Sequence, residues 1–417
     1  MRMVKWKNCI GIGILALCLT LNGCSAAEKA ADLAEEALLS HMNPSDDSGN
    51  TGEQTELPSR RETAPEDSGQ TGPAADSAEE KAEDLCYYYS VLEEDDRSIY
   101  DAFYEGLSAH SEDILLDTED TDLVYKLYEM ILADHPELFW VDGGYSYLAG
   151  HMNIKVIPEY SYSVSEVEVR QSAIDQVTDR ALEEILAEGP ATDYEIVKAV
   201  FEYVVKNVSY DTKSTDNQNL YSAMVNRESV CAGYTRETQY LLQQLGIQAL
   251  FISGEVKDVG SHAWNMVRCD GQYYLVDATY GDCAFQGEDI IESLPEALTC
   301  DYNYLCCTDT RLMANRTYHE WAILPRCDSE NLNYYRLNGR YYESVGEELT
   351  NDLKESILAG DTYWSCQFSN REAYEEFLGM VKESYYLKLV LQLCELGQVK
   401  GYSTYNDDFY SVSCWYY

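Results

Sequence analysis

Cys231, His262 and Asp277 are the residues whose types and order are suited to covalent chemistry. They occur in the segments Ser-Val-Cys-Ala-Gly-Tyr, Ser-His-Ala-Trp-Asn and Tyr-Leu-Val-Asp-Ala-Thr-Tyr-Gly-Asp. A thiolate attacks a carbonyl carbon, an imidazole accepts and returns the proton, and a carboxylate orients the imidazole. Taken singly, a Cys or a His is more often a structural residue. The chemistry is therefore expected only if the three side chains meet in the folded protein.

Cys231 is predicted to lie in the first turn of a helix. Ser229 is a candidate N-cap, because its hydroxyl can accept a hydrogen bond from a free backbone N–H. Apolar residues then recur at helical spacing until Gly246, where the helix is expected to stop. The first turn of a helix carries a positive partial charge, which favours the thiolate, the nucleophilic form of cysteine.

A hairpin is predicted to carry His262 and Asp277. Its two strands are residues 262–268 and 272–277. Asp270-Gly271 lies between them and is a strong signal for a two-residue turn. The sequence therefore predicts that the His and the Asp lie on adjacent antiparallel strands.

The two-residue turn also fixes the register of this hairpin. Cys269 then faces Gln272, and Asp277 lies opposite Trp264. His262 and Asp277 become diagonal neighbours on one face, with Cβ atoms roughly 7–8 Å apart or somewhat less, so that two polar side chains can meet. A three-residue loop would break this register.

The three segments together resemble the core motifs of the transglutaminase-like, papain-related superfamily. The resemblance covers about residues 190–285. It implies an α+β core in which a helix carrying the Cys packs on an antiparallel sheet. It also implies that Cys231 is the nucleophile, His262 the base and Asp277 the residue that orients the base, although Tyr280 stands where relatives often carry Trp. The superfamily includes crosslinking enzymes, thiol peptidases, deamidases and inactive binding modules, so the resemblance implies fold and residues better than reaction.

An oxyanion formed at the attacked carbonyl needs two preorganised hydrogen-bond donors. The backbone N–H of Cys231 is one candidate. Tyr210, Gln218 and Tyr221 are candidates for the second donor or for a wall of the substrate site, and each is at least as well explained as plain structure. Trp264 shares a face with the imidazole in the predicted register, so it either walls the site or belongs to the core.

The composition disfavours some classes of partner and cofactor. The 417-residue chain has 74 acidic and 29 basic side chains, which gives a formal net charge of −45. Nucleic acid and anionic lipid headgroups are therefore unfavourable partners. The expected chemistry needs no metal or organic cofactor, and the spacing of the cysteines matches no common zinc site. The expected partner is a protein or peptide substrate, with cell-wall peptide as one form of it.

Residues 1–23 are predicted to be a signal peptide. They combine basic residues with an apolar run that is too short to span a bilayer comfortably. The run ends in Leu21-Asn22-Gly23-Cys24, which resembles a bacterial lipobox and implies lipidation of Cys24. An ordinary signal peptide and an uncleaved anchor are the alternatives. All three place the protein outside the cytoplasm, and the lipobox implies a lipid anchor at the extracytoplasmic face of the cell membrane.

Four further segments follow the signal peptide. Residues 24–84 are rich in small and acidic residues and predict a disordered tether. Residues 85–165 predict a small α+β accessory domain, residues 166–330 the transglutaminase-like core, and residues 331–417 a small C-terminal α+β domain. Asn338-Gly339 predicts a hairpin turn in the last of these.

Two functions of different classes fit these residues. The first is an extracytoplasmic acyl-transfer enzyme that acts on amide or peptide bonds, with hydrolysis favoured over crosslinking for a tethered surface protein. A factor that modifies cell wall or peptide would use the same chemistry on a narrower target. The second is a non-catalytic surface module that binds protein or cell wall on the same fold. A complete set of three groups favours the enzyme, because a pure binding module has no need of all three.

Overall fold

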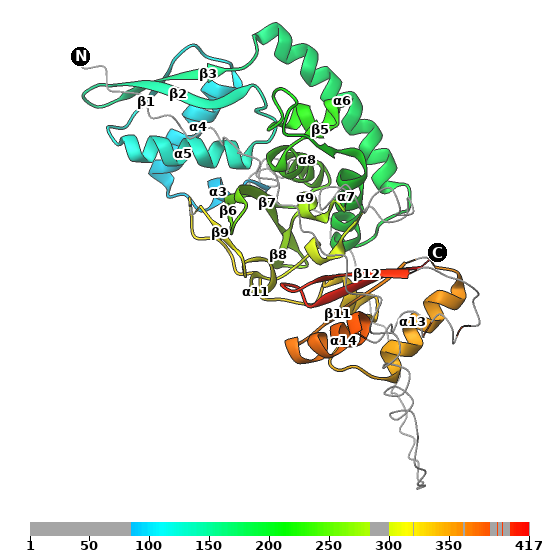
Figure 1. The fold of residues 1–417 in the computed structure, drawn as a ribbon. Helices are drawn as coiled ribbons and strands as arrows, with labels where there is room; N and C mark the ends of the chain where they lie inside the picture. The colour runs from blue at the N-terminus through cyan, green and yellow to red at the C-terminus, as the bar shows by residue number, and fades with distance from the viewer. Residues whose placement is uncertain are drawn as a thin grey trace, which may run out of the picture.

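The computed structural model describes residues 85–283, 300–319, 321–361, 363–383 and 401–416, together with Val390 and Cys394. The predicted signal peptide, the lipid anchor at Cys24 and the tether lie outside the described residues and stay predictions. The described chain is an α+β protein in which most strand pairs are antiparallel (Figure 1). Within the described residues, no helix combines the length and the apolar character needed to cross a membrane.

The first part of the described chain is a three-stranded antiparallel sheet with helices beside it. The sheet has the order β1 (Ile114–Leu116), β3 (Ile154–Tyr160) and β2 (Val141–Ala149). The helices are α3 (Tyr87–Ser90), α4 (Glu94–Ser108) and α5 (Thr121–Asp134). The side chain of Asp120 caps α5, because it accepts hydrogen bonds from the first backbone N–H groups of that helix.

This part shares its core with the segment that follows it, as far as Cys327. Buried apolar side chains from Tyr87 to Cys327, joined by Phe409, form one continuous cluster. Polar contacts cross the same boundary, since Gln239 donates to the carbonyl oxygen of Ala133 at 2.7 Å. Residues 85–165 are therefore packed directly on the helix that begins at Cys231 and on the sheet that contains His262.

Two helices lead toward Cys231. They are α6 (Val164–Leu186) and α7 (Asp193–Asn207). Thr192 and Glu195 form the capping box that the sequence predicts at the start of α7. Figure 1 shows α6 as the long helix along the edge of the molecule, with α7 and α8 (Cys231–Gln244) inside it. Short elements join α7 to α8: β4 (Ser209–Tyr210), the π-helical turn Ser222–Asn226, and β5 (Glu228–Ser229), which pairs in parallel with β4.

A four-stranded antiparallel sheet packs against α8. Its order is β8 (Gln272–Val276), β7 (Gly260–Cys269), β6 (Ala249–Val256) and β9 (Arg316–Tyr318). The buried side chain of Asn265 on β7 donates to the carbonyl oxygen of Thr235 in α8 at 3.0 Å, which ties helix to sheet. The short helices α9 (Ala278–Gly281), η2 (Tyr302–Tyr304) and α11 (Asp309–Leu312) follow the hairpin.

The C-terminal part has its own sheet and its own core. The sheet has the order β10 (Tyr341–Tyr342), β11 (Tyr363–Phe368), β13 (Ser411–Tyr416) and β12 (Gly401–Asn406). Its helices are α12 (Tyr334–Leu337), α13 (Glu347–Ala359) and α14 (Arg371–Glu383). A second cluster of buried apolar side chains lies between this sheet and the helices α13 and α14.

The predicted hairpin at Asn338-Gly339 is wrong. Residues 334–337 form α12, whose first turn is capped by the side chain of Asn333. Gly339 has a φ of +69°, which suits the residue after a helix as well as a hairpin turn. The same Asn-Gly pair therefore ends a helix here, and β10 pairs in parallel with β11.

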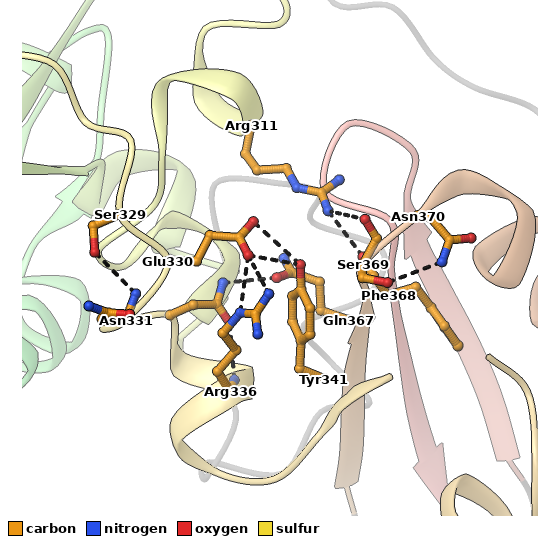
Figure 2. A network of polar contacts seen from close by, with 11 residues as sticks. Arg311, Ser329, Glu330, Asn331, Arg336, Tyr341, Gln367, Phe368, Ser369 and Asn370 are labelled. Carbon is orange, nitrogen blue, oxygen red and sulfur yellow. Dashed lines mark hydrogen bonds and ion pairs between the residues drawn. The ribbon is translucent and has the colours of Figure 1, made fainter. Parts of the chain in front are cut away.

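Side chains join the C-terminal part to the rest of the molecule. The buried guanidinium of Arg311 donates to the carbonyl oxygen of Phe368 at 3.0 Å, as Figure 2 shows. Glu330 lies beside this contact and binds Arg336 and the hydroxyl of Tyr341. The C-terminal sheet is thus held against the segment that carries α11 and β9.

Gly254 offers a test of the close packing of β9 on β6. A Cβ atom at Gly254 would overlap the carbonyl oxygen of Thr317 in β9. We expect Gly254→Ala to lower the free energy of unfolding by about 1–3 kcal/mol, because the backbone itself must move. Chemical denaturation measures the change. Gly379→Ala in α14 is the matched control, since open space surrounds that position and the substitution should be neutral or slightly stabilising. Equal stability of both variants would contradict this packing.

Candidate active site

Helix α8 begins at Cys231, as the sequence predicts, but Ser229 does not cap it. The N-cap residue is Val230, and no side chain caps the helix. Ser229 belongs to strand β5, where its hydroxyl donates to the carbonyl oxygen of Asn217 at 2.6 Å. The prediction of a Ser229 cap is wrong because strand pairing places that residue one position too early. Within the described chain the backbone N–H of Cys231 has no acceptor, so it is available to an incoming group.

The predicted turn and register of the hairpin are confirmed. Asp270 and Gly271 have φ values of +50° and +74°, as a two-residue hairpin turn of this type requires. Cys269 pairs with Gln272, and the ladder continues to the pair of Asn265 and Val276. The local sequence is therefore sufficient to set which residues of β7 and β8 face each other.

The predicted strand position of Asp277 is wrong. Strand β8 ends at Val276, so Asp277 is not part of the ladder and does not pair with Trp264. It is instead the N-cap of α9, and its Oδ1 accepts the backbone N–H of Tyr280 at 3.0 Å. The cap holds one carboxylate oxygen and leaves the other, Oδ2, for the imidazole.

The structure brings His262 and Asp277 together. His262 Nε2 lies 2.9 Å from Asp277 Oδ2. Because Nε2 is engaged in this way, Nδ1 is the ring nitrogen left for a further partner, and Cys231 lies close enough to raise the pKa of the imidazole. Cys231 is 3% exposed, His262 5% and Asp277 0%, so the whole set is shielded from water. A thiol, an imidazole and a carboxylate are therefore gathered in one buried set, as the sequence predicts.

Charge stabilises the ionised forms of the pair. Burial alone would lower the pKa of His262, but the charge of Asp277 and hydrogen bonds with Asp277 and Cys231 raise it to about 9. Burial would raise the pKa of Asp277, but the charges of His262 and Arg316 hold it well below its usual range. An imidazolium beside the thiol favours the thiolate.

Arg316 is a neighbour of this site that the sequence analysis misses. Its Nη1 donates to Asp277 Oδ2, the same oxygen that faces His262. Its guanidinium lies among three aromatic rings, 4.6 Å from the centroid of Tyr280, 5.3 Å from that of Trp264 and 5.8 Å from that of Tyr304. Residue 316 lies in a three-residue strand within a segment that carries no clear pattern, so no local signal indicates this contact.

Tyr210 lies near the reacting groups. Burial and the nearby Cys231, Tyr280 and Asp277 raise the pKa of Tyr210 well above its usual range, so its hydroxyl stays protonated and able to donate. Tyr280 is close as well, since its ring meets that of His262 edge-on at 5.1 Å.

The other candidates for the site wall have different roles. Gln218 is exposed, whereas Cys231, His262 and Asp277 are buried. The guanidinium carbon of Arg170 lies 4.3 Å from the centroid of the Tyr221 ring, and Tyr221 also packs beside Phe139. Trp264 is fully buried with its ring 5.9 Å from that of His262 and nearly parallel to it, so it supports the imidazole from within the core.

The described residues also bear on metal binding. Among them, no group of three or more His, Cys, Asp or Glu side chains is placed to hold a metal ion. Cys300, Cys306, Cys307 and Cys327 are buried and belong to the same apolar cluster as Cys269 of the hairpin. These thiols therefore belong to the core beneath the hairpin.

Comparison with known proteins identifies the same segment. The profile of the transglutaminase-like superfamily matches residues 180–278, which include Cys231, His262 and Asp277. Kyphoscoliosis peptidase from Mus musculus is 22% identical over 146 residues, and the human protein of that name is 22% identical over 149 residues. These stretches cover 31% and 32% of this chain but 21% of each relative, so the chain matches about a fifth of the length of these curated relatives.

Solved structures with partial similarity include a TGase and the periplasmic domain of TgpA from Pseudomonas aeruginosa. The first is 17% identical with a TM-score of 0.24 and covers 33% of this chain and 44% of its own. The second is 16% identical with a TM-score of 0.20 and covers 31% of this chain and 55% of its own. TM-scores this low do not show a shared fold. The transglutaminase-like profile, together with the α+β elements that carry its motifs, identifies the domain. Residues 180–278 of this chain are a transglutaminase-like domain.

Proposed function

We propose that this protein is a thiol-dependent acyl-transfer enzyme that acts on amide or peptide bonds of proteins or peptides. The observation that carries the proposal is the buried set of Cys231, His262 and Asp277, in which the imidazole binds the carboxylate and Cys231 lies close enough to raise the imidazole pKa. Removing three polar groups from water is costly unless they satisfy one another, and a binding module gains nothing from this arrangement. The alternative, a non-catalytic module that binds protein or cell wall, therefore ranks second.

In the proposed reaction, the Cys231 sulfur attacks the carbonyl carbon of the substrate. His262 first takes the thiol proton on Nδ1 and later gives it to the leaving amine, which departs as the thioester forms. Water or a second amine then attacks the thioester and regenerates the thiol. Asp277 keeps the imidazole ring in place throughout and stabilises its positive charge.

The negative oxygen that develops on the attacked carbonyl needs donors. The free backbone N–H of Cys231 at the start of α8 is one proposed donor. The Tyr210 hydroxyl is the proposed second donor, because it stays protonated beside Cys231. Tyr210 comes from β4, whose pairing with β5 fixes its position relative to the start of α8.

The setting favours hydrolysis over crosslinking. The signal peptide, the lipid anchor at Cys24 and the tether are predictions from the sequence, and together they indicate a protein held at the outer face of a membrane. A surface-tethered enzyme has water as its most abundant acceptor and meets peptide or cell-wall peptide as substrate. We include this location and this substrate class in the proposal.

The reactivity of Cys231 can be compared with that of other thiols in the same molecule. We expect iodoacetamide to label Cys231 fastest at about pH 5 to 6, because a thiolate beside an imidazolium reacts where free thiols do not. Cys86 is the internal control, since it is less buried but its pKa is raised by burial and by Asp134. Site-resolved mass spectrometry of the wild type and of His262→Ala measures both rates. Slow labelling of Cys231 in both proteins would overturn the proposal.

The pH above which activity falls should match the pKa of the His262 imidazole. The pKa of His262 is raised to about 9, so the ring stays protonated up to that pH and loses its proton above it. We expect kcat/KM for peptide hydrolysis to fall above about pH 9. In Asp277→Asn, the fall should begin near the ordinary value of about 6.5. Because the pKa of His262 is higher in the folded protein than in the unfolded chain, the ion pair contributes its full stability to the fold below about pH 6.5. This contribution is lost as the pH rises through about 9. An identical alkaline limb in both proteins would argue against the pairing.

Hydrolysis and amine transfer can be distinguished by product mass. We expect a peptide library incubated with the enzyme to yield mainly hydrolysed products, even with a primary amine present at millimolar concentration. Cys231→Ala should give neither product, because the thioester cannot form. Predominant amine incorporation would keep the thiol mechanism but reverse the preference for hydrolysis.

A further inference from the structure

We infer that Arg316 is a positioning residue of this site, which fixes the Asp277 carboxylate and sets the net charge beside Cys231. The inference rests on the proposed function, because it assigns a role in the same chemistry. It concerns a residue outside the 180–278 segment that matches the superfamily profile.

The contact between Arg316 and Asp277 completes the hydrogen bonding of the carboxylate. Oδ1 accepts the backbone N–H of Tyr280, whereas Oδ2 accepts from both His262 and Arg316. The carboxylate is thereby held from three directions and cannot rotate away from the imidazole. A carboxylate fixed in this way fixes the ring that it orients.

Fold stability alone does not account for Arg316. Its side chain is 2% exposed, and within the described chain its Nε has no hydrogen-bond partner. Burying a charge costs several kcal/mol, and buried ion pairs often add nothing to stability compared with apolar packing. The surrounding aromatic rings offset part of this cost through cation–π contacts. The remaining benefit of the cation is its effect on the reacting groups.

The effect of Arg316 on Cys231 follows from the charges of the neighbouring groups. Asp277 carries one negative charge, while Arg316 and the protonated His262 each carry one positive charge. The group next to Cys231 therefore has a net positive charge, which favours a thiolate. Without the guanidinium the same group would be neutral. Every proton in the network would then be held more tightly, including that of the thiol.

The fold holds Arg316 from two sides. Strand β9 pairs with β6, where Gly254 lies opposite both Tyr318 and His262, so β6 is the spacer between the arginine strand and the imidazole strand. On the other side, Asn315 donates to Asp408 at 2.8 Å in the turn between β12 and β13. The C-terminal part thus secures the residue that precedes Arg316.

The test compares Arg316→Gln with Arg316→Lys. Gln keeps a donor without the charge, and Lys keeps the charge without the planar fork. For iodoacetamide labelling of Cys231, we expect the acid-side midpoint to rise by about one pH unit in Arg316→Gln and to stay near that of the wild type in Arg316→Lys. A merely structural role would lower stability in both variants and leave the midpoint in place, and that result would overturn the inference.

A second readout separates this inference from the proposed function. The titration of the His262 ring, followed by NMR, should move to higher pH in Arg316→Gln even if Cys231 proves unreactive. Fast labelling of Cys231 in the wild type with unchanged midpoints in Arg316→Gln would leave the proposed function standing and refute the role of Arg316. If Arg316→Gln does not fold, Arg316→Lys decides: a wild-type midpoint supports the charge role, and a rise of about one unit in a folded protein contradicts it.

Discussion

The site depends on one buried carboxylate. Asp277 receives the imidazole of His262, the guanidinium of Arg316 and a backbone N–H of α9, and these contacts come from different elements of the sheet and the segment after it. Because the carboxylate is buried, each of these donors is needed to offset its desolvation. The charge that they hold in place keeps His262 protonated beside the start of α8. The geometry of the nucleophile is therefore linked to elements far away in the sequence.

Local signals predict much of this arrangement. Asp270-Gly271 sets the turn and the turn sets the register of β7 and β8, after which Asp277 reaches His262 as the N-cap of α9. The apolar pattern up to Gly246 likewise places Cys231 at the start of its helix. In each case the determining residues lie within a few positions of the element that they shape, and one turn or helix suffices to position the side chain.

Nonlocal contacts account for what the sequence does not predict. Arg316 reaches the site because β9 pairs with β6, about 60 residues earlier in the chain, and a three-residue strand leaves no periodicity to detect. Ser229 has the chemistry of a helix cap, but strand pairing with Tyr210 takes it away from the helix. Asn338-Gly339 fits both a hairpin turn and a helix end, and here it follows a short helix whose first turn is capped by Asn333.

The most direct test of the account measures the thiolate itself. The ultraviolet absorbance of a thiolate, taken as the difference between the wild type and Cys231→Ser, reports the ionisation of Cys231 without a substrate. The account predicts that this signal is present under conditions in which free thiols stay protonated, and that it is lost in His262→Ala. A difference signal that appears only above about pH 8 in the wild type would contradict the thiolate–imidazolium pair and the mechanism built on it.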